Sequence, residues 1–205
     1  NNPTWPTEWI LQSVLIAWED YKYTGNKQSL EHFYSDLKAK TLIELSDENG
    51  FISTRTGRVT PEIMSSINYN GNIRDIVDWP HPGSFGMVDD KKGETDGFVF
   101  TDINTVVNAF HYRAIELLAK IAETLEKYED YNYYSKRASN LKKVFNEYLF
   151  DEKRGVYKDG LDTDHASLHA NMFPLAFGMV EEENRELVLE FIRSRGMACS
   201  VYGSQ

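Results

Sequence analysis

A carboxylate and an indole stand side by side at Asp78 and Trp79, directly after the apolar run of residues 73–77. Pro80 and Pro82 follow, and proline continues neither a helix nor a strand ladder. We therefore predict that Asp78 and Trp79 lie on a stiff turn. A pyranose has polar edges and apolar C–H faces, so this pair suits sugar binding. Taken alone, these residues fit still better a core tryptophan beside an aspartate that caps a turn, because buried aromatic residues are common.

His165 and His169 form a second candidate pair, because residues four apart share one face of a helix. Two histidines at this spacing can bind zinc, but Ala166 stands where the HExxH motif has its glutamate. No third ligand is evident, so we predict no metal ion and no cofactor. The remaining alternatives are packed structural histidines or recognition of hydroxyl groups in a cleft.

The sequence also predicts where three other polar residues lie. Glu8 is either a charge at the start of a helix or a site carboxylate beside Trp5 and Trp9. His111 falls within an apolar stripe and is predicted in the core, whereas His32 is predicted on the surface. The sequence contains neither a glycine-rich phosphate loop nor a G-x-S-x-G elbow.

Composition excludes several classes of protein. The 205 residues are 41% hydrophobic, which is enough for a globular core. The net charge of −10 opposes binding to nucleic acid, which requires clustered basic side chains. Cys199 is the single cysteine and is predicted to be a small buried residue, so neither an internal disulfide nor a cysteine-based zinc cluster can form. No apolar run approaches the roughly 20 residues that span a bilayer, so we expect no membrane partner.

Periodic apolar residues predict three helical hairpins, near residues 8–45, 102–149 and 165–195. Thr7 is the expected N-cap of the first helix, and Gly25 its stop. Thr163 or Asp164 is expected to cap the helix that carries the two histidines. Each hairpin has a tight internal link, and longer connections join one hairpin to the next.

The segment of residues 46–100 shows no sustained helical period and reads as a long irregular insertion. Short strand-like pieces occur at residues 51–54 and 98–100. Residues 87–97 are acidic and rich in glycine, and we expect them to form an exposed, mobile flap. A turn and one short strand are predicted within residues 151–160.

Five ordered motifs together resemble the catalytic domain of bacterial α-L-rhamnosidases, the six-hairpin glycosidases of glycoside hydrolase family 78. The motifs are Trp5-Pro-Thr-Glu8-Trp-Ile-Leu-Gln, Trp18-Glu-Asp-Tyr-Lys-Tyr-Thr-Gly25, Val77-Asp78-Trp79-Pro80, Ala166-Ser-Leu-His169-Ala-Asn-Met-Phe-Pro-Leu-Ala-Phe-Gly178 and Gly196-Met-Ala-Cys-Ser-Val-Tyr202-Gly. The resemblance implies an all-α (α/α)6 toroid that hydrolyses terminal α-L-rhamnosyl bonds with inversion. Three hairpins are half of that barrel, so residues 1–205 are expected to form a partial catalytic domain, an open arc with an apolar flank for the missing half.

The sequence departs from this family at the catalytic carboxylates. The family's general acid belongs to an Asp-Glu-Arg segment followed by Trp-x-Gly-Asp, and its general base belongs to a Trp-Trp-Glu-like segment. Neither motif occurs among residues 1–205. We therefore expect both groups to lie outside this chain and the chain alone to be inactive.

The resemblance implies a rhamnose-containing oligosaccharide or glycoside as the partner, with Asp78 and Glu8 as auxiliary carboxylates. The substrate-binding residues that it implies are Trp5, Trp79, His81, His165, His169 and Tyr202. We expect Asp78, Trp79, Glu8 and at least one histidine to line one concave surface. On that view Asp78→Asn lowers kcat/KM and barely changes the melting temperature. By the same resemblance the compartment is periplasmic or extracellular, although a cytoplasmic enzyme remains an alternative.

Two other classes fit parts of the pattern. A glucuronyl hydrolase or a polysaccharide lyase would share the six-hairpin fold but needs basic residues for acidic sugars, which the candidate loops lack. A non-catalytic helical interaction module would explain the hairpins without a sugar site. It predicts that Asp78, Trp79 and His169 lie scattered.

Overall fold

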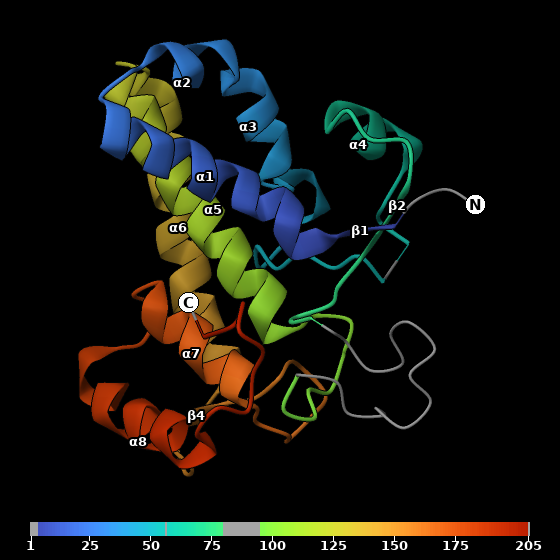
Figure 1. The fold of residues 1–205 in the computed structure, drawn as a ribbon, viewed down its shortest axis with the longest axis vertical. Coiled ribbons are helices and arrows are strands. Elements are labelled where there is room, and N and C mark those ends of the chain that lie inside the picture. The colour runs from blue at the N-terminus through green and yellow to red at the C-terminus, as the bar shows by residue number, and fades with distance from the viewer. Residues whose placement is uncertain (1–3, 56, 80–94, 205) are drawn as a thin grey trace. The chain divides into compact units, whose positions relative to one another are not determined.

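The structure, a computed structural model, describes residues 4–55, 57–79 and 95–204 (Figure 1). The chain divides into two compact units. The first unit comprises residues 1–75 and 110–144, and the second comprises residues 76–109 and 145–205. The single partial barrel over residues 1–205, with its open arc, stays a prediction.

Most of the described elements are helices, which confirms the all-α fold class. The helices are α1 (Thr7–Thr24), α2 (Gln28–His32), α3 (Tyr34–Lys40), η1 (Ile43–Leu45), α4 (Pro61–Ser66), α5 (Thr105–Thr124), α6 (Tyr128–Leu149), α7 (Leu168–Ala176), η3 (Glu182–Asn184) and α8 (Arg185–Arg195). The strands are β1 (Thr4–Pro6), β2 (Asn72–Arg74), β3 (Phe150–Asp151) and β4 (Val156–Tyr157). None of the described helices is long and apolar enough to cross a membrane.

Helix α1 follows its predicted periodicity and buries Ile10, Leu11 and Val14. It ends as expected at Gly25, whose φ of 67° is in the left-handed region and whose N–H donates to the carbonyl of Tyr21. Its start differs from the prediction, because Pro6 occupies the N-cap position and makes no side-chain cap. Thr7 is itself helical, and its buried Oγ1 has no hydrogen-bond partner among the described residues.

The second helix of the first hairpin is broken. Phe33 separates α2 from α3, and its side chain is exposed instead of joining the apolar stripe. The break reorients the chain so that Leu30 of α2 and Tyr34 and Leu37 of α3 are all buried, and both helices contact α1. Phe33 therefore interrupts the second helix of the hairpin that was predicted near residues 8–45.

The predicted insertion contains more regular structure than its composition indicated. Strand β2 pairs in parallel with β1, with Trp5 opposite Ile73. Helix α4 begins after Thr60, whose hydroxyl accepts a hydrogen bond from the N–H of Ile63. The strand-like piece at residues 51–54 forms only an isolated bridge at Ile52, and residues 98–100 are not a strand.

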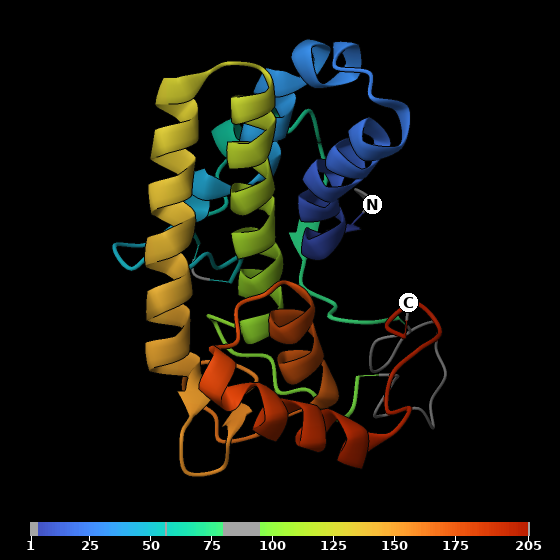
Figure 2. The ribbon, with the colours of Figure 1, turned by 90° about the vertical axis from the view of Figure 1, so that its left-hand side faces the viewer.

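Helices α5 and α6 run side by side across a link of residues 125–127 (Figures 1 and 2). In the part of this pair that belongs to the first unit, the stripe of α5 buries Ala114, Leu118 and Ile121, as its period predicts. His111 is fully buried on the same helix, which confirms its predicted place in the core, and His32 is exposed. The Nδ1 atom of His111 lies 2.7 Å from the carbonyl oxygen of Thr41.

Burial lowers the pKa of His111 to about 4, although its contact with the Thr41 carbonyl acts in the opposite direction. The unfolded chain binds this proton near pH 6.5, so stability is lost as the pH falls from about 6.5 towards 4. Between pH 7.5 and 5 we expect the free energy of unfolding of the wild type to fall by about 2 kcal/mol more than that of His111→Asn. Urea denaturation at both pH values measures this. His32→Asn is the matched control and should keep the wild-type pH dependence.

In the second unit, helix α7 packs against a pair of short strands and against helix α8. Strands β3 and β4 form an antiparallel pair, where one strand was predicted. Asn171 of α7 accepts a hydrogen bond from the N–H of Tyr157 at 2.8 Å and donates to its carbonyl at 3.0 Å. Helices α7 and α8 pack together (Figure 2). Helix α7 is thereby fixed on two sides.

Candidate active-site wall around helix α7

Three carboxylates of the second unit surround the start of α7. They are Asp78, Asp96 and Asp159, and each has one basic partner: His169, Arg195 and His165, respectively. We call these six residues the α7 cluster. Its members are widely separated in the sequence, so local structure alone does not bring them together.

Asp78 is the most completely bound member of the cluster. Its Oδ1 accepts hydrogen bonds from the Trp79 N–H at 2.7 Å and the Ser200 hydroxyl at 2.5 Å. Its Oδ2 accepts from His169 Nε2 at 2.7 Å and from the Ser200 N–H at 2.9 Å. An ionised carboxylate has about four lone-pair sites, so these donors use its capacity. The side chain of Asp78 is 3% exposed, and that of His169 is 0% exposed.

The turn before Asp78 is strained. The Asp78 N–H donates to the carbonyl of Ile76 at 2.7 Å, and Val77 between them has a φ of 65°. This is a γ-turn of the rare positive-φ form, and a β-branched residue is costly there. Such strain persists only where the surroundings impose it and is frequent at functional sites. The hydrogen bonds to Asp78 are the surroundings that hold this turn.

His169 is held from one side of its ring. Because the Asp78 carboxylate only accepts, Nε2 of His169 is the donor to it. The buried Nδ1 atom of His169 has no hydrogen-bond partner among the described residues. Gly203 lies against the same carboxylate, where an added Cβ would be 2.6 Å from Asp78 Oδ2. The residue after Tyr202 therefore has no room for a side chain.

Asp159 organises the segment that precedes α7. It is fully buried and accepts hydrogen bonds from the N–H groups of Val99 and Ser167, each at 2.8 Å. His165 Nδ1 lies 2.5 Å from its Oδ2. The side chain of His165 is 40% exposed, and a Cβ added to Gly97 would be 3.7 Å from its Nε2. One ring nitrogen of His165 is therefore fixed, while the ring reaches the surface.

Asp96 provides a hydrogen-bond acceptor at the N-terminus of α7. It accepts a hydrogen bond from the N–H of Leu168 at 2.7 Å and forms a two-point ion pair with Arg195. Ser167 is the N-cap, and its hydroxyl accepts from the N–H of Ala170. The flap predicted over residues 87–97 lies mostly outside the described residues. At its described end Thr95 is buried and Asp96 is paired with Arg195, whereas Gly97 is exposed as predicted.

The electrostatics at Asp78 and Asp96 favour the charged carboxylates. Burial opposes ionisation of Asp78, but hydrogen bonds from His169, Ser200 and Trp79 outweigh it and hold the pKa of Asp78 below its usual value. Burial likewise opposes ionisation of Asp96, and Arg195 and the N–H of Leu168 lower the pKa of Asp96 overall. The described residues contain no group of three or more His, Cys, Asp or Glu side chains that could hold a metal ion.

The structure brings some predicted site residues together and separates others. Asp78 and His169 are in contact, against the scatter that an interaction module predicts. His165 and His169 do not share a helical face, because α7 begins at Leu168 and His165 precedes it. The Thr163 hydroxyl accepts from the His165 N–H and caps a turn there, not the helix.

The other predicted residues have three different outcomes. Trp79 is half-buried beside Asp78, and Tyr202 is 75% exposed. Glu8, which is buried, and Trp5, which is exposed, belong to the first unit, so their placement relative to Asp78 stays a prediction. His81 and the two prolines lie outside the described residues.

Sequence reasoning missed Asp159, Asp96, Arg195 and Ser200. All four are polar residue types that are common on surfaces. Asp159-Gly160 has the composition of an exposed turn, yet Asp159 is completely buried. A Cβ on Gly160 would collide with the Thr101 hydroxyl and the Ile103 carbonyl, a close approach that the sequence does not reveal.

The family model described as the bacterial alpha-L-rhamnosidase six-hairpin glycosidase domain matches residues 1–201. The chain belongs to this family. Membership agrees with the motifs around Asp78 and His169 and selects the rhamnosidase domain over the other six-hairpin enzymes. It also accounts for the paired helices of the fold.

Relatives of this rhamnosidase-family chain are much longer than the chain itself. An alpha-L-rhamnosidase of Formosa agariphila is 27% identical over 173 residues, which are 84% of this chain and 15% of the relative. The solved alpha-L-rhamnosidase from Dictyoglumus thermophilum has a TM-score of 0.59 and 24% identity over 90% of this chain and 17% of its own.

A second solved structure shows the same fold. The GH78 family rhamnosidase of Bacillus sp. GL1 has a TM-score of 0.65 and 18% identity, covering 96% of this chain and 18% of its own. The rhamnosidase-family chain therefore spans less than a fifth of each of these relatives.

Proposed function

We propose that the protein containing this chain hydrolyses terminal α-L-rhamnosyl bonds of an oligosaccharide or glycoside with inversion of configuration. The observation that carries the proposal is the buried Asp78–His169–Ser200 network, which fixes Trp79 on a strained turn within a rhamnosidase-family chain. An indole fixed in this way can stack on an apolar sugar face. The names of the relatives support rhamnose as the sugar.

Within this proposal, the predicted site residues of the second unit divide by exposure. Trp79, His165 and Tyr202 are at least partly exposed and are proposed to face the substrate. Asp78 and His169 are buried and are proposed to hold Trp79 in place. This changes the expected role of Asp78, because its oxygens already accept four hydrogen bonds and a sugar hydroxyl would have to displace one.

In this proposal the catalytic pair lies outside residues 1–205, and neither Asp78 nor Asp96 is its general acid. An inverting glycosidase needs one protonated carboxyl group and one carboxylate about 6.5–9.5 Å apart. The proton donor needs a raised pKa, whereas the pKa values of Asp78 and Asp96 are both lowered. These two residues are therefore suited to hold structure and not to donate a proton. Developing positive charge on the sugar would still be favoured by nearby carboxylates.

Hydrolysis of p-nitrophenyl α-L-rhamnoside by the full-length protein tests the proposal. Proton NMR at early times should show β-L-rhamnose as the first product, because inversion changes the anomer. Residues 1–205 alone should give no turnover above the buffer rate. Turnover of other p-nitrophenyl glycosides but not of the rhamnoside would reject the proposed substrate. Rhamnoside turnover by the isolated chain at the full-length rate would place the catalytic pair within residues 1–205.

A further inference from the structure

A concave surface lies entirely within the first unit. It is a hollow of about 620 Å³ between α4 and the loop that leads into β2. This volume falls within the roughly 300–1,000 Å³ of small-molecule sites. Its lining combines hydroxyl and amide groups with apolar ones, including Thr60, Met64, Tyr69, Asn70 and Asn72.

The segment that forms this hollow is held by hydrogen bonds to residues outside the lining. The Thr54 hydroxyl donates to the buried Asp75 at 2.9 Å. Asn68, whose φ is 55°, donates through its side-chain amide to Asp36 at 2.9 Å. Strand β2 is paired to β1 along its length. A preformed frame reduces the ordering that a ligand must impose, which favours binding.

A row of aromatic rings adjoins the hollow. Tyr69 lines it and meets Trp5 edge to face, with ring centroids 5.7 Å apart. Trp5 in turn meets Trp9 at 6.1 Å. The two tryptophans are 45% and 48% exposed. Large apolar rings that stay exposed side by side mark a binding surface.

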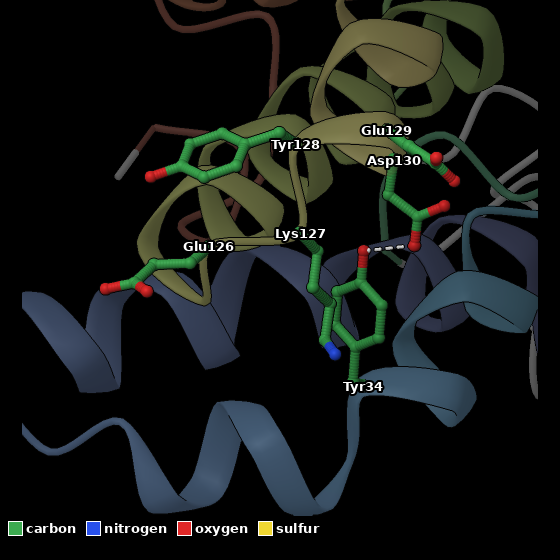
Figure 3. A pocket seen from close by; sticks show the side chains of 6 residues that line it. All are labelled: Tyr34, Glu126, Lys127, Tyr128, Glu129 and Asp130. Carbon is green, nitrogen blue, oxygen red and sulfur yellow. Dashed lines mark hydrogen bonds between the residues drawn. The ribbon is translucent and has the colours of Figure 1, made fainter.

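The charge of the lining restricts the ligand. None of the described residues that line the hollow carries a charge. A second hollow of about 470 Å³ in the same unit provides the contrast, because Glu126, Lys127, Glu129 and Asp130 line it (Figure 3). Anionic ligands are bound through Arg or Lys, and the described lining offers neither. Amides, hydroxyls and aromatic rings without charge suit a neutral polyhydroxylated ligand.

We infer that the hollow beside Tyr69 is a saccharide-binding site that takes neutral sugar units of the substrate, in addition to the rhamnosyl unit. The side-chain amides of Asn70 and Asn72 face the sugar hydroxyls, and Tyr69 offers a ring to its C–H face. That these sugar units belong to the substrate rests on the proposed function. Binding itself requires no hydrolysis, so the two can be tested separately.

Direct binding to the full-length protein tests this site. The probes are neutral hexasaccharides of glucose, galactose, mannose and xylose, none of which carries rhamnose, with hexagalacturonate as the charged comparison. Calorimetry and saturation-transfer NMR should show binding of at least one neutral probe. Tyr69→Ala combined with Asn72→Ala should weaken that Kd at least tenfold and leave kcat/KM for p-nitrophenyl α-L-rhamnoside within twofold. Tyr128→Ala, at the charged hollow, is the matched control and should bind as the wild type does.

Asn70→Arg provides a second variant if the double variant does not fold. Asn70 is exposed, so a long charged side chain is tolerated and occupies the hollow. It should also weaken binding at least tenfold. The site is rejected if no neutral probe binds, if both variants bind as the wild type does, or if hexagalacturonate binds as tightly as the neutral probes. Saccharide binding without rhamnoside hydrolysis would reject the proposed function and keep this site.

Discussion

Asp78→Ala is expected to lower the free energy of unfolding by about 3–5 kcal/mol, because it removes a buried carboxylate that accepts four hydrogen bonds. The change leaves the His169 ring and the Ser200 hydroxyl and N–H without their acceptor in a buried place. Each buried donor without a partner costs about 1–3 kcal/mol. Urea denaturation of the full-length protein, together with hydrogen exchange of peptides from α7, measures the loss.

Asp78→Asn separates the structural role from a catalytic one. The amide keeps one acceptor oxygen but directs an NH2 group at a donor, so we expect a lower melting temperature as well as a kcat/KM at least about tenfold lower. The sequence alone predicted an unchanged melting temperature, on the premise that Asp78 is a cleft carboxylate. Its burial overturns that premise. Glu190→Ala, at an exposed position of α8, is the control and should stay within about 0.5 kcal/mol of the wild type.

An unchanged melting temperature in Asp78→Asn, with the activity lost, would contradict the positioning role. It would return Asp78 to direct contact with the sugar. The pH dependence gives an independent check, because the pKa of Asp78 is lowered in the folded state. Its contribution is present above the unfolded value of about 3.9 and is lost as the pH falls further. Asp78→Ala should therefore lose less stability than the wild type below pH 4.

The parts of the fold that follow local rules were predictable from sequence. The apolar period of α1 and α5, the glycine stop at Gly25 and the core position of His111 need only neighbours within a few turns. The β1–β2 pair was missed because both strands are short and β1 ends in Pro6, which argues against a strand. Its pairing depends on a partner nearly seventy positions away in the sequence.

The start of α7 shows why the site was only partly predictable. Thr163, Asp164 and Ser167 are all good N-cap residues, so the sequence offers several beginnings. The choice is made by Asp159 and Asp96, which bind the N–H groups of Ser167 and Leu168. Asp78 and His169 stood out because an indole and a second histidine lie near them in the sequence. Asp159 had no such neighbour, and only tertiary contacts reveal it.

Asp159→Ala is expected to destabilise the protein by about 3–5 kcal/mol, the effect of removing a buried carboxylate from its histidine and N–H partners. The N–H of Ser167 is buried and would lose its acceptor, so the cap of α7 would fail with it. Urea denaturation measures the loss, with Asp164→Ala as the control. Asp164 is exposed in the same loop, and its removal should cost less than about 0.5 kcal/mol.

A double-mutant cycle then shows whether Asp159 also acts through His165. Asp159→Asn should lower kcat/KM for the rhamnoside where His165 is present, because Asp159 fixes the ring that is proposed to face the substrate. In the His165→Gln background the same change should have a smaller effect, with a coupling energy of about 0.5–3 kcal/mol. Strict additivity would show that Asp159 supports only the fold. An unfolding free energy of Asp159→Ala close to that of the wild type would contradict both roles, because the buried N–H groups would then have found another acceptor.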